Sequence, residues 1–196
     1  MYQRFGKRLL DVLISLIFLP LLALILLACA PFIYFEDRGP IFFVQKRRGR
    51  YGKPFDILKL RTMSPKAPDL RAADGSTLAS NQDPRVTRSG RVLRRTSLDE
   101  VPQLLNVLKG DMSLVGPRPT LATADYAAYS AVKKKRLRVR PGITGYSQAY
   151  HRNAISAEEK FRLDALYVDS LSFRLDLKII LKTITSVLRR KDINND

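Results

Sequence analysis

An uncharged apolar run near the N-terminus constrains this chain more than any other feature. It extends from Val12 to Phe35 and contains no Asp, Glu, Lys or Arg in 24 residues. A straight helix of that length would reach about 36 Å, which is enough to cross a hydrocarbon core of about 30 Å. The run is too long for the apolar region of a cleaved signal peptide, and no small-residue cleavage site leads into a polar start. The sequence therefore predicts a membrane-inserted helix.

Basic residues stand on both sides of this run. Cytoplasmic flanks of membrane helices carry the Lys and Arg excess, so both ends of the run favour the same side of the membrane. Pro20 removes a helix hydrogen bond and predicts a kink near Leu16–Pro20. A re-entrant helix that dips into one leaflet and returns explains both features, and an ordinary spanning helix with a proline kink is the alternative. The flanking cations are Arg4, Lys7 and Arg8 before the run and Arg38, Lys46, Arg47, Arg48 and Arg50 after it.

The charge balance indicates a polyanionic partner. The chain has 35 Lys and Arg against 18 Asp and Glu, a net charge of +17 and a pI near 10.4. Nucleic acid, an anionic membrane surface or a phosphorylated substrate would fit this balance. The single cysteine, Cys29, excludes an intrachain disulfide, and the single histidine, His151, excludes a His-rich zinc site. A bound metal would therefore be a hard ion held by oxygen, such as Mg²⁺.

Patterns after residue 38 predict a mixture of strands and helices. Two β-prone segments, Ile41–Val44 and Phe55–Leu60, are separated by a basic stretch with glycines, which predicts a β-hairpin. Ser64–Asn81 has no apolar period and predicts a surface loop. Further helices are expected over Thr120–Arg138, over Ala157–Val168 with Ser156 as its cap, and over Leu175–Arg190. The last is basic and amphipathic, which is typical of a helix lying on a bilayer and equally of one packed on a soluble core.

An amphipathic helix is also predicted after Ser97. Its apolar residues recur at the spacing of one helix face, and Gly110 is placed to end it. The members of that face are Leu98, Val101, Leu104, Leu105 and Leu108.

Two adjacent carboxylates, Asp99 and Glu100, stand at the start of this helix. One interpretation is structural: Ser97 and Glu100 form a capping box, or Asp99 is the cap, which would place Pro102 where proline is tolerated. Capping needs only one carboxylate, however. The other interpretation is catalytic, because an ionised carboxylate near cations can coordinate Mg²⁺ or attack phosphorus to give an acyl phosphate.

A phosphate-bearing substrate would repel such a nucleophile unless cations neutralised the charge. Arg118 is a candidate, because Pro117 and Pro119 fix the backbone on both sides of it and so limit the entropy lost on binding. Four arginines lie close upstream of the acidic pair. They are Arg88, Arg91, Arg94 and Arg95.

These motifs, taken in their order along the chain, resemble those of the bacterial sugar transferases, the monotopic polyprenyl-phosphate phosphoglycosyl transferases. The resemblance covers nearly the whole chain and is closest to the small form with a minimal catalytic domain. The matching segments are Lys7–Asp11, Gly39–Gly49, Phe55–Met63, Ser89–Pro119, Arg140–Gly145 and Tyr167–Ile184.

The resemblance implies an α+β fold. Residues 1–38 would form a re-entrant membrane helix with basic flanks. Residues 39–196 would form a small helix-rich catalytic domain with a β-hairpin and amphipathic interfacial helices, at the cytoplasmic face of the bacterial inner membrane. Anionic lipids would help to hold the domain there.

The resemblance also implies a reaction in glycoconjugate and polysaccharide biosynthesis. Asp99 would attack the phosphate that carries the sugar of a UDP-sugar, UMP would leave, and a polyprenol phosphate, undecaprenyl phosphate by expectation, would take the sugar phosphate. Glu100 would be a base or a positioning group, and Mg²⁺ would be required with Asp99 as its ligand. The implied substrate-binding residues are Arg118 with Pro117 and Pro119, and then Lys59, Arg61, Arg94 and Arg95.

Two segments depart from the family pattern. Many members break the membrane helix at a Ser-Pro deeper in the segment, whereas this chain has Leu19 before Pro20, so the position of the break is open. Residues 146–153, YSQAYHRN, replace the more usual Trp-Ala-Gln-Val-Asn-Gly-Arg, and Tyr150 and His151 there could alter sugar preference. No role is assigned to His151.

Two rival functions receive less support from the sequence. A membrane-tethered nucleic-acid binder would need aromatic residues among its basic clusters or a reading helix, and neither is recognisable, so no nucleic-acid partner is expected. A catalytically dead scaffold does not require an intact acidic pair. The sugar transferred, the pathway and the oligomeric state stay open, and an oligomer is compatible with the sequence.

Overall fold

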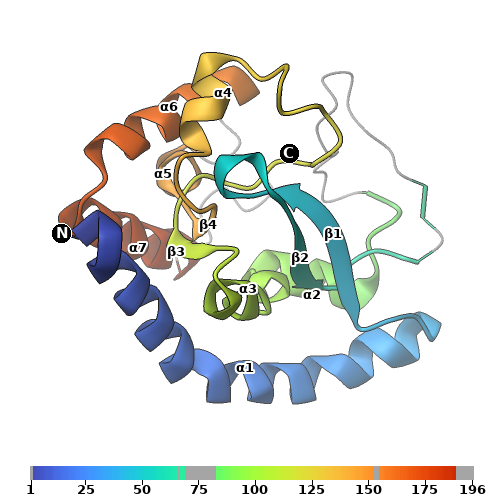
Figure 1. The fold of residues 1–196 in the computed structure, drawn as a ribbon. Helices are drawn as coiled ribbons and strands as arrows, with labels where there is room; N and C mark the ends of the chain where they lie inside the picture. The colour runs from blue at the N-terminus through green and yellow to red at the C-terminus, as the bar shows by residue number, and fades with distance from the viewer. Residues whose placement is uncertain (1, 66, 69–82, 152–154, 189–196) are drawn as a thin grey trace.

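The long helix α1 (Lys7–Asp37) dominates the computed structural model and follows a π-helical turn at Tyr2–Gly6. Helix α1 stays helical through Pro20 and Pro31, and its axis changes direction as it passes beneath the other elements (Figure 1). The predicted apolar helix is therefore confirmed, and among the described residues it is the one helix long and apolar enough to cross a membrane. The structure describes residues 2–65, 67–68, 83–151 and 155–188.

Only one face of α1 is buried against the rest of the chain. Large apolar side chains elsewhere on the helix, such as Ile17 and Leu27, are more than 70% exposed. Exposed apolar surface on this scale marks an interaction with lipid or a partner, which agrees with membrane association. The buried residues of α1 are Asp11, Ser15, Leu22 and Ile33.

A β-hairpin follows α1, as predicted. Strands β1 (Phe42–Arg48) and β2 (Pro54–Leu60) pair antiparallel, with Val44 opposite Leu58. A 3-10 turn at Arg50–Gly52 joins them, and the positive φ of 76° at its last residue suits a glycine. The predicted surface loop that comes next, Ser64–Asn81, lies almost entirely outside the described residues.

The centre of the fold is a short parallel strand pair. Helix α2 (Arg88–Thr96), the 3-10 turn η3 (Leu98–Glu100) and helix α3 (Gln103–Lys109) lead into β3 (Ser113–Val115). Strand β3 pairs parallel with β4 (Gly142–Thr144), a strand that the sequence patterns did not predict. This pair joins two segments that are far apart in the sequence, and Figure 1 shows it to the left of the hairpin.

Only part of the helix predicted over Thr120–Arg138 forms. Helix α4 spans Ala131–Arg136 and is capped by Ser130. The prediction is wrong for residues 120–130, because the start of this segment pairs with the hairpin instead: the Arg48 N–H donates to the Thr120 carbonyl at 2.8 Å. The edge of β1 thus supplies hydrogen-bond partners for the backbone at the start of this segment, in place of a helix.

The C-terminal helices follow the sequence more closely. After the short α5 (Tyr146–Tyr150) comes α6 (Ala157–Ser170), whose Ser156 cap accepts a bond from the Glu159 N–H as predicted. Helix α7 (Phe173–Leu188) has buried residues in the core and also four exposed large apolar residues. The core interpretation of this helix is therefore confirmed for its buried side, and contact of its exposed side with a bilayer stays a prediction. The exposed residues are Phe173, Leu177, Leu181 and Ile184.

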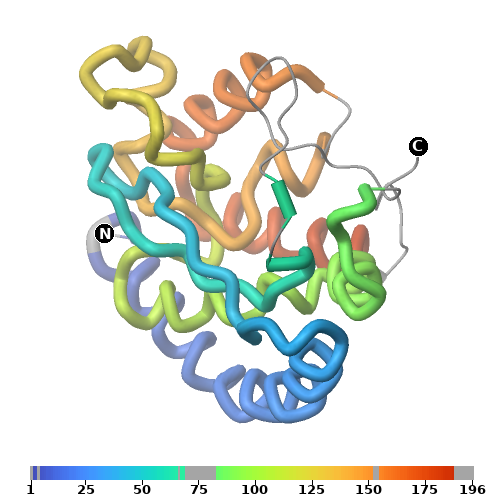
Figure 2. Tube along the Cα trace, turned by 90° about the vertical axis from the view of Figure 1, so that its right-hand side faces the viewer, coloured from blue at the N-terminus to red at the C-terminus, as the bar shows by residue number. Residues whose placement is uncertain are grey.

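Polar contacts join the first turns of α1 to the domain that follows. Asp176 of α7 accepts from the Tyr2 hydroxyl, from Lys7 Nζ at 2.6 Å and from the Tyr167 hydroxyl. Buried Asp11 accepts from the Leu114 N–H at 3.0 Å. Figure 2 shows α1 running along one side of the remaining elements, so the membrane helix and the domain pack as one unit.

Candidate active site

The acidic pair lies on η3, a single 3-10 turn between α2 and α3. Ser97 adopts a left-handed conformation (φ 58°) and ends α2, and its side chain caps nothing. Pro102 is the N-cap of α3 and has no side-chain cap bond. Both capping interpretations are therefore wrong, because a sharp turn at Ser97 and a helix start after Pro102 leave Asp99 and Glu100 outside any cap.

The apolar face expected after Ser97 is not the buried face. The residues of α3 that are buried are Gln103, Asn106 and Val107, whereas Leu105 is 39% exposed. The cause is Asn106, whose side chain accepts from the Leu58 N–H at 2.9 Å and donates to the Asp56 carbonyl at 2.8 Å. These bonds fix the rotation of α3 against β2 and turn the leucines away from the core.

Two cations hold Glu100. Lys59 Nζ lies 2.6 Å and Arg118 Nη2 lies 3.2 Å from the same carboxylate oxygen, Oε1 of Glu100. Burial acts to raise the pKa of Glu100, but the two cations outweigh it and lower that pKa to about 2 from an ordinary value of 4.5. Glu100 is therefore ionised throughout the physiological pH range.

Asp99 is placed differently. Within the described chain its carboxylate has no hydrogen-bond or ion-pair partner, although Lys59, Arg118 and Arg94 are near enough to act on it electrostatically. Burial, with a smaller contribution from Glu100, raises the pKa of Asp99 to about 6. A carboxylate with this pKa is still mostly ionised at pH 7 and has oxygen lone pairs free to react.

Arg118 extends from a rigid turn. Pro117 is fully buried, Pro119 is buried beside it, and the Arg118 carbonyl accepts from Nη2 of Arg136 at 2.7 Å. Arg136 is only 3% exposed and pairs with buried Asp164 at 2.8 Å. The Arg118 side chain itself is 55% exposed, so it can swing from Glu100 to a substrate while its backbone stays fixed.

Arg136 and Asp164 are functional candidates that the sequence did not single out. Arg136 looked like one member of the Lys133–Arg136 basic cluster, and Asp164 lies 28 residues further on. Asp164 also accepts from the Ser147 hydroxyl at 2.8 Å, which ties α5 to the same network. No sequence signal linked these two residues, because their pairing depends on how α4 packs against α6.

Of the other predicted substrate-binding arginines, Arg94 lies at the cavity of the acidic pair and Arg95 does not. Arg94 lines the same cavity as the acidic pair and donates to the Thr62 hydroxyl at 3.0 Å. Arg95 is exposed and is not among the described residues that line this cavity. Lys59, Arg94 and Arg118 thus converge on the acidic pair.

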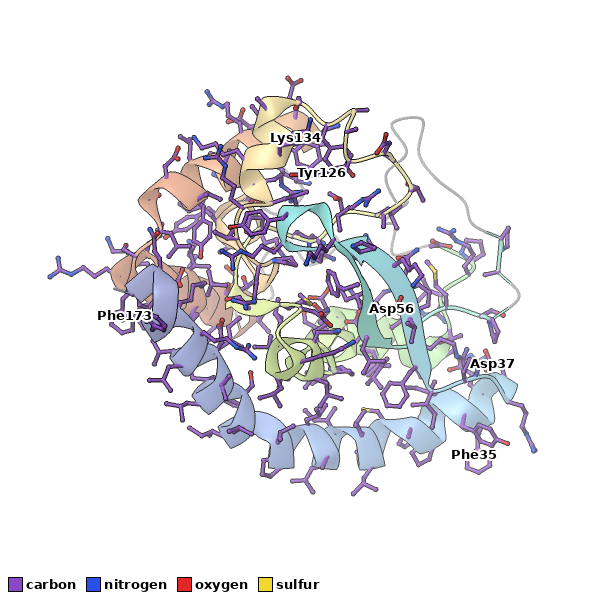
Figure 3. All side chains as sticks on the ribbon, in the orientation of Figure 1. Phe35, Asp37, Asp56, Tyr126, Lys134 and Phe173 are labelled. Atoms are coloured by element: carbon purple, nitrogen blue, oxygen red, sulfur yellow. The ribbon has the colours of Figure 1, made fainter. Side chains whose placement is uncertain are left out.

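Arg61 lines the cavity but is occupied by contacts within the fold. It is 5% exposed, and all five of its guanidinium N–H groups donate to groups at the end of α1 and around the hairpin. Asp37, its ionic partner, lies at the C-terminal end of α1 (Figure 3). A substrate-binding role for Arg61 stays a prediction. The acceptors are the Asp37 carboxylate and the carbonyls of Ile33, Pro40 and Met63.

The carboxylate oxygens of this site suit a magnesium ion that is held partly by the protein and partly by a substrate. In the part of the chain that the structure describes, no group of three His, Cys, Asp or Glu residues could hold a metal alone. Mg²⁺ is commonly bound by one or two carboxylates together with substrate phosphates and water. The free carboxylate of Asp99 provides such a ligand, so the residues present fit the predicted ion.

Comparisons with known proteins agree with this site. A family model described as bacterial sugar transferase matches residues 2–190. A curated relative, the uncharacterized sugar transferase EpsL of Bacillus subtilis (strain 168), is 46% identical over 93% of this chain and 87% of its own length. UDP-glucose:undecaprenyl-phosphate glucose-1-phosphate transferase of Caulobacter vibrioides is 44% identical over 93% of this chain and 69% of its own length.

A third relative is a longer protein. UDP-N-acetylgalactosamine-undecaprenyl-phosphate N-acetylgalactosaminephosphotransferase of Aeromonas hydrophila is 39% identical over 94% of this chain but only 44% of its own length. The Caulobacter and Aeromonas relatives are thus both named as sugar-phosphate transferases that use undecaprenyl phosphate, and their named sugars differ.

Proposed function

Because the chain belongs to the bacterial sugar transferase family and is a phosphoglycosyl transferase, we propose that it acts through a covalent intermediate on Asp99. The donor is a UDP-sugar and the acceptor is undecaprenyl phosphate or a related polyprenol phosphate, as in the names of its relatives. The observation that carries the proposal is the contrast between the two carboxylates: Glu100 is paired with two cations, and Asp99 is free beside them.

In the first step, an Asp99 carboxylate oxygen attacks the phosphorus that carries the sugar. A new O–P bond forms, the bond from that phosphorus to the oxygen shared with UMP breaks, and UMP leaves with the electron pair. In the second step, an oxygen of the polyprenol phosphate attacks the same phosphorus and releases Asp99. The product is polyprenyl-diphosphate-sugar, and the carboxylate is regenerated.

The cations of the site stabilise the charge that moves during these steps. Arg118 and Lys59 are placed to contact phosphate oxygens, and Arg94 adds positive charge from the α2 side. A bound Mg²⁺, held by Asp99 together with substrate phosphates, would supply further neutralisation.

Glu100 has a positioning role in this proposal. A carboxylate with a pKa of about 2 is a poor general base near neutral pH, because efficient bases have a pKa close to the working pH. Its bonds to Lys59 and Arg118 instead hold both cations close to Asp99, where the substrate phosphate would bind.

The site also requires a membrane surface, because the acceptor is a lipid. We place the enzyme at the cytoplasmic face of the bacterial inner membrane, where UDP-sugars are available, with α1 inserted as a re-entrant helix. Its net charge of +17 favours anionic lipids, each nearby Lys or Arg being worth roughly 1 kcal/mol.

The test measures UMP release from purified protein in detergent with Mg²⁺, a panel of UDP-sugars and undecaprenyl phosphate. Asp99→Asn should abolish release, and intact-mass analysis of the wild type without acceptor should find a sugar phosphate bound to Asp99. Asp169→Asn, which removes an exposed carboxylate paired with Lys135, should keep full activity as the matched control. Full activity in Asp99→Asn would falsify the nucleophile assignment.

A further inference from the structure

An apolar face beside the acidic pair is only partly used for the core, because Leu98 packs against the cluster of Ile33, Leu60 and Leu93 whereas no described core cluster contains Val101 or Leu104. Leu98, Val101 and Leu104 follow one another at the spacing of one helical face, yet all three stay partly exposed and line the same cavity as Asp99 and Glu100. Deviations from local folding rules concentrate at functional positions. This face is therefore a candidate binding surface.

Helix α1 also lines this cavity. Its lining residues lie at positions i, i+4, i+7 and i+11, which is one helical face about 16 Å long. Strand β1 adds Phe42 and Val44, both exposed. The lining residues of α1 are Ile14, Phe18, Leu21 and Ile25.

The lining of this cavity has an apolar part and a charged part. Helix α1, strand β1 and the leucine face supply the apolar part, and large apolar side chains elsewhere on α1 are exposed. The charged part includes the cations Lys59 and Arg94 beside the acidic pair. A ligand that fits both parts has one phosphate head and one long apolar tail.

We propose that the groove between α1 and the face formed by Leu98, Val101 and Leu104 binds the head-proximal isoprene units of the acceptor. This proposal rests on the proposed function and adds a tail-binding site to it. Continuity with Asp99 favours the acceptor over a structural phospholipid, because Leu98 directly precedes the nucleophile and the bound tail leads its phosphate to that carboxylate. The site thus selects acceptors by their tails as well as their phosphates.

Two adjacent leucines offer a matched comparison. Leu104 lines the groove, and Leu105 is 39% exposed and does not line it among the described residues. Loss of a leucine contact with the tail should raise the KM for undecaprenyl phosphate about tenfold in Leu104→Asn. The kcat and the KM for the UDP-sugar should stay unchanged, and Leu105→Asn should match the wild type in all three constants.

A second pair of variants, on α1, tests the proposal even if the α3 variants fold poorly. Phe18→Ala should raise the acceptor KM, whereas Ile17→Ala, in the next position but outside the groove lining, should not. The wild type should also prefer undecaprenyl phosphate to farnesyl phosphate at a fixed detergent concentration, and Leu104→Asn should reduce that preference.

If Leu104→Asn and Phe18→Ala have the same acceptor KM as their controls, the tail-binding proposal is wrong. That result would indicate that phospholipid or detergent covers these residues instead. An equal rise in the KM for the UDP-sugar and the KM for undecaprenyl phosphate would also contradict the proposal, because a site for the tail affects only the acceptor. Failure of the proposed function looks different: the wild type would then release no UMP from any UDP-sugar.

Discussion

Asn106 offers a direct test of how the fold positions the acidic pair. Its side chain is 5% exposed and forms two hydrogen bonds to β2, the strand that carries Lys59. In Asn106→Leu, a side chain of similar size keeps the packing but leaves the Leu58 N–H and the Asp56 carbonyl without their partner. Each unsatisfied group costs about 1–3 kcal/mol, so the variant should lose about 4 kcal/mol of stability.

For a chain of this length, 1 kcal/mol shifts the Tm by roughly 2–4 °C, so the expected fall is about 8–16 °C. Circular dichroism in detergent at one fixed scan rate measures it, because irreversible unfolding makes Tm depend on scan rate. Asn106→Asp keeps the acceptor for the Leu58 N–H but loses the donor to the Asp56 carbonyl. Its Tm should lie between those of Asn106→Leu and the wild type. Arg162→Met, which removes only an exposed pair with Glu159, should leave the Tm unchanged. A Tm for Asn106→Leu within 2 °C of the wild type would refute this account of α3.

Three further predictions concern ionised groups. Lys59→Met should lower kcat about a hundredfold and raise the pKa of Glu100, which NMR titration of labelled glutamate would detect. Because the folded-state pKa of Glu100 is depressed, its contribution to stability is present above about pH 4.5 and lost as the pH falls toward 2; wild-type Tm should drop across that window more steeply than in Lys59→Met. Arg136→Met should lower the Tm sharply by leaving Asp164 buried and unpaired, and an additional Asp164→Leu should restore much of the loss; a double variant no more stable than the single would contradict this.

The sequence predicts the parts of this fold that depend on local patterns. Two β-prone segments separated by glycines indicated the hairpin, and the Ser156 cap indicated the start of α6. Upstream arginines and the prolines around Arg118 drew attention to Arg94 and Arg118, and the family resemblance added Lys59. These features need no knowledge of what packs against them.

Other features depend on partners distant in sequence and could not be found in this way. The parallel pairing of Ser113 with Gly142 joins short segments that show no strand pattern of their own. The helix predicted over residues 120–138 does not begin at Thr120, because residues 120–122 pair with the free edge of β1. The buried face of α3 is set by Asn106, a polar residue that a hydrophobicity pattern counts as exposed.

The errors around Ser97 share one physical cause. Capping by Asp99 or Glu100 would have satisfied backbone N–H groups and removed that carboxylate from chemistry, and packing of the leucine face would have closed the way from the membrane. The turn instead leaves one carboxylate held by Lys59 and Arg118 at a pKa of about 2 and its neighbour unpaired at about 6. Environments that separate the pKa values of adjacent acids assign them different roles. In the mechanism and groove that we propose, this single turn forms no cap and supplies a positioning acid, an unpaired nucleophile and an apolar approach for a lipid.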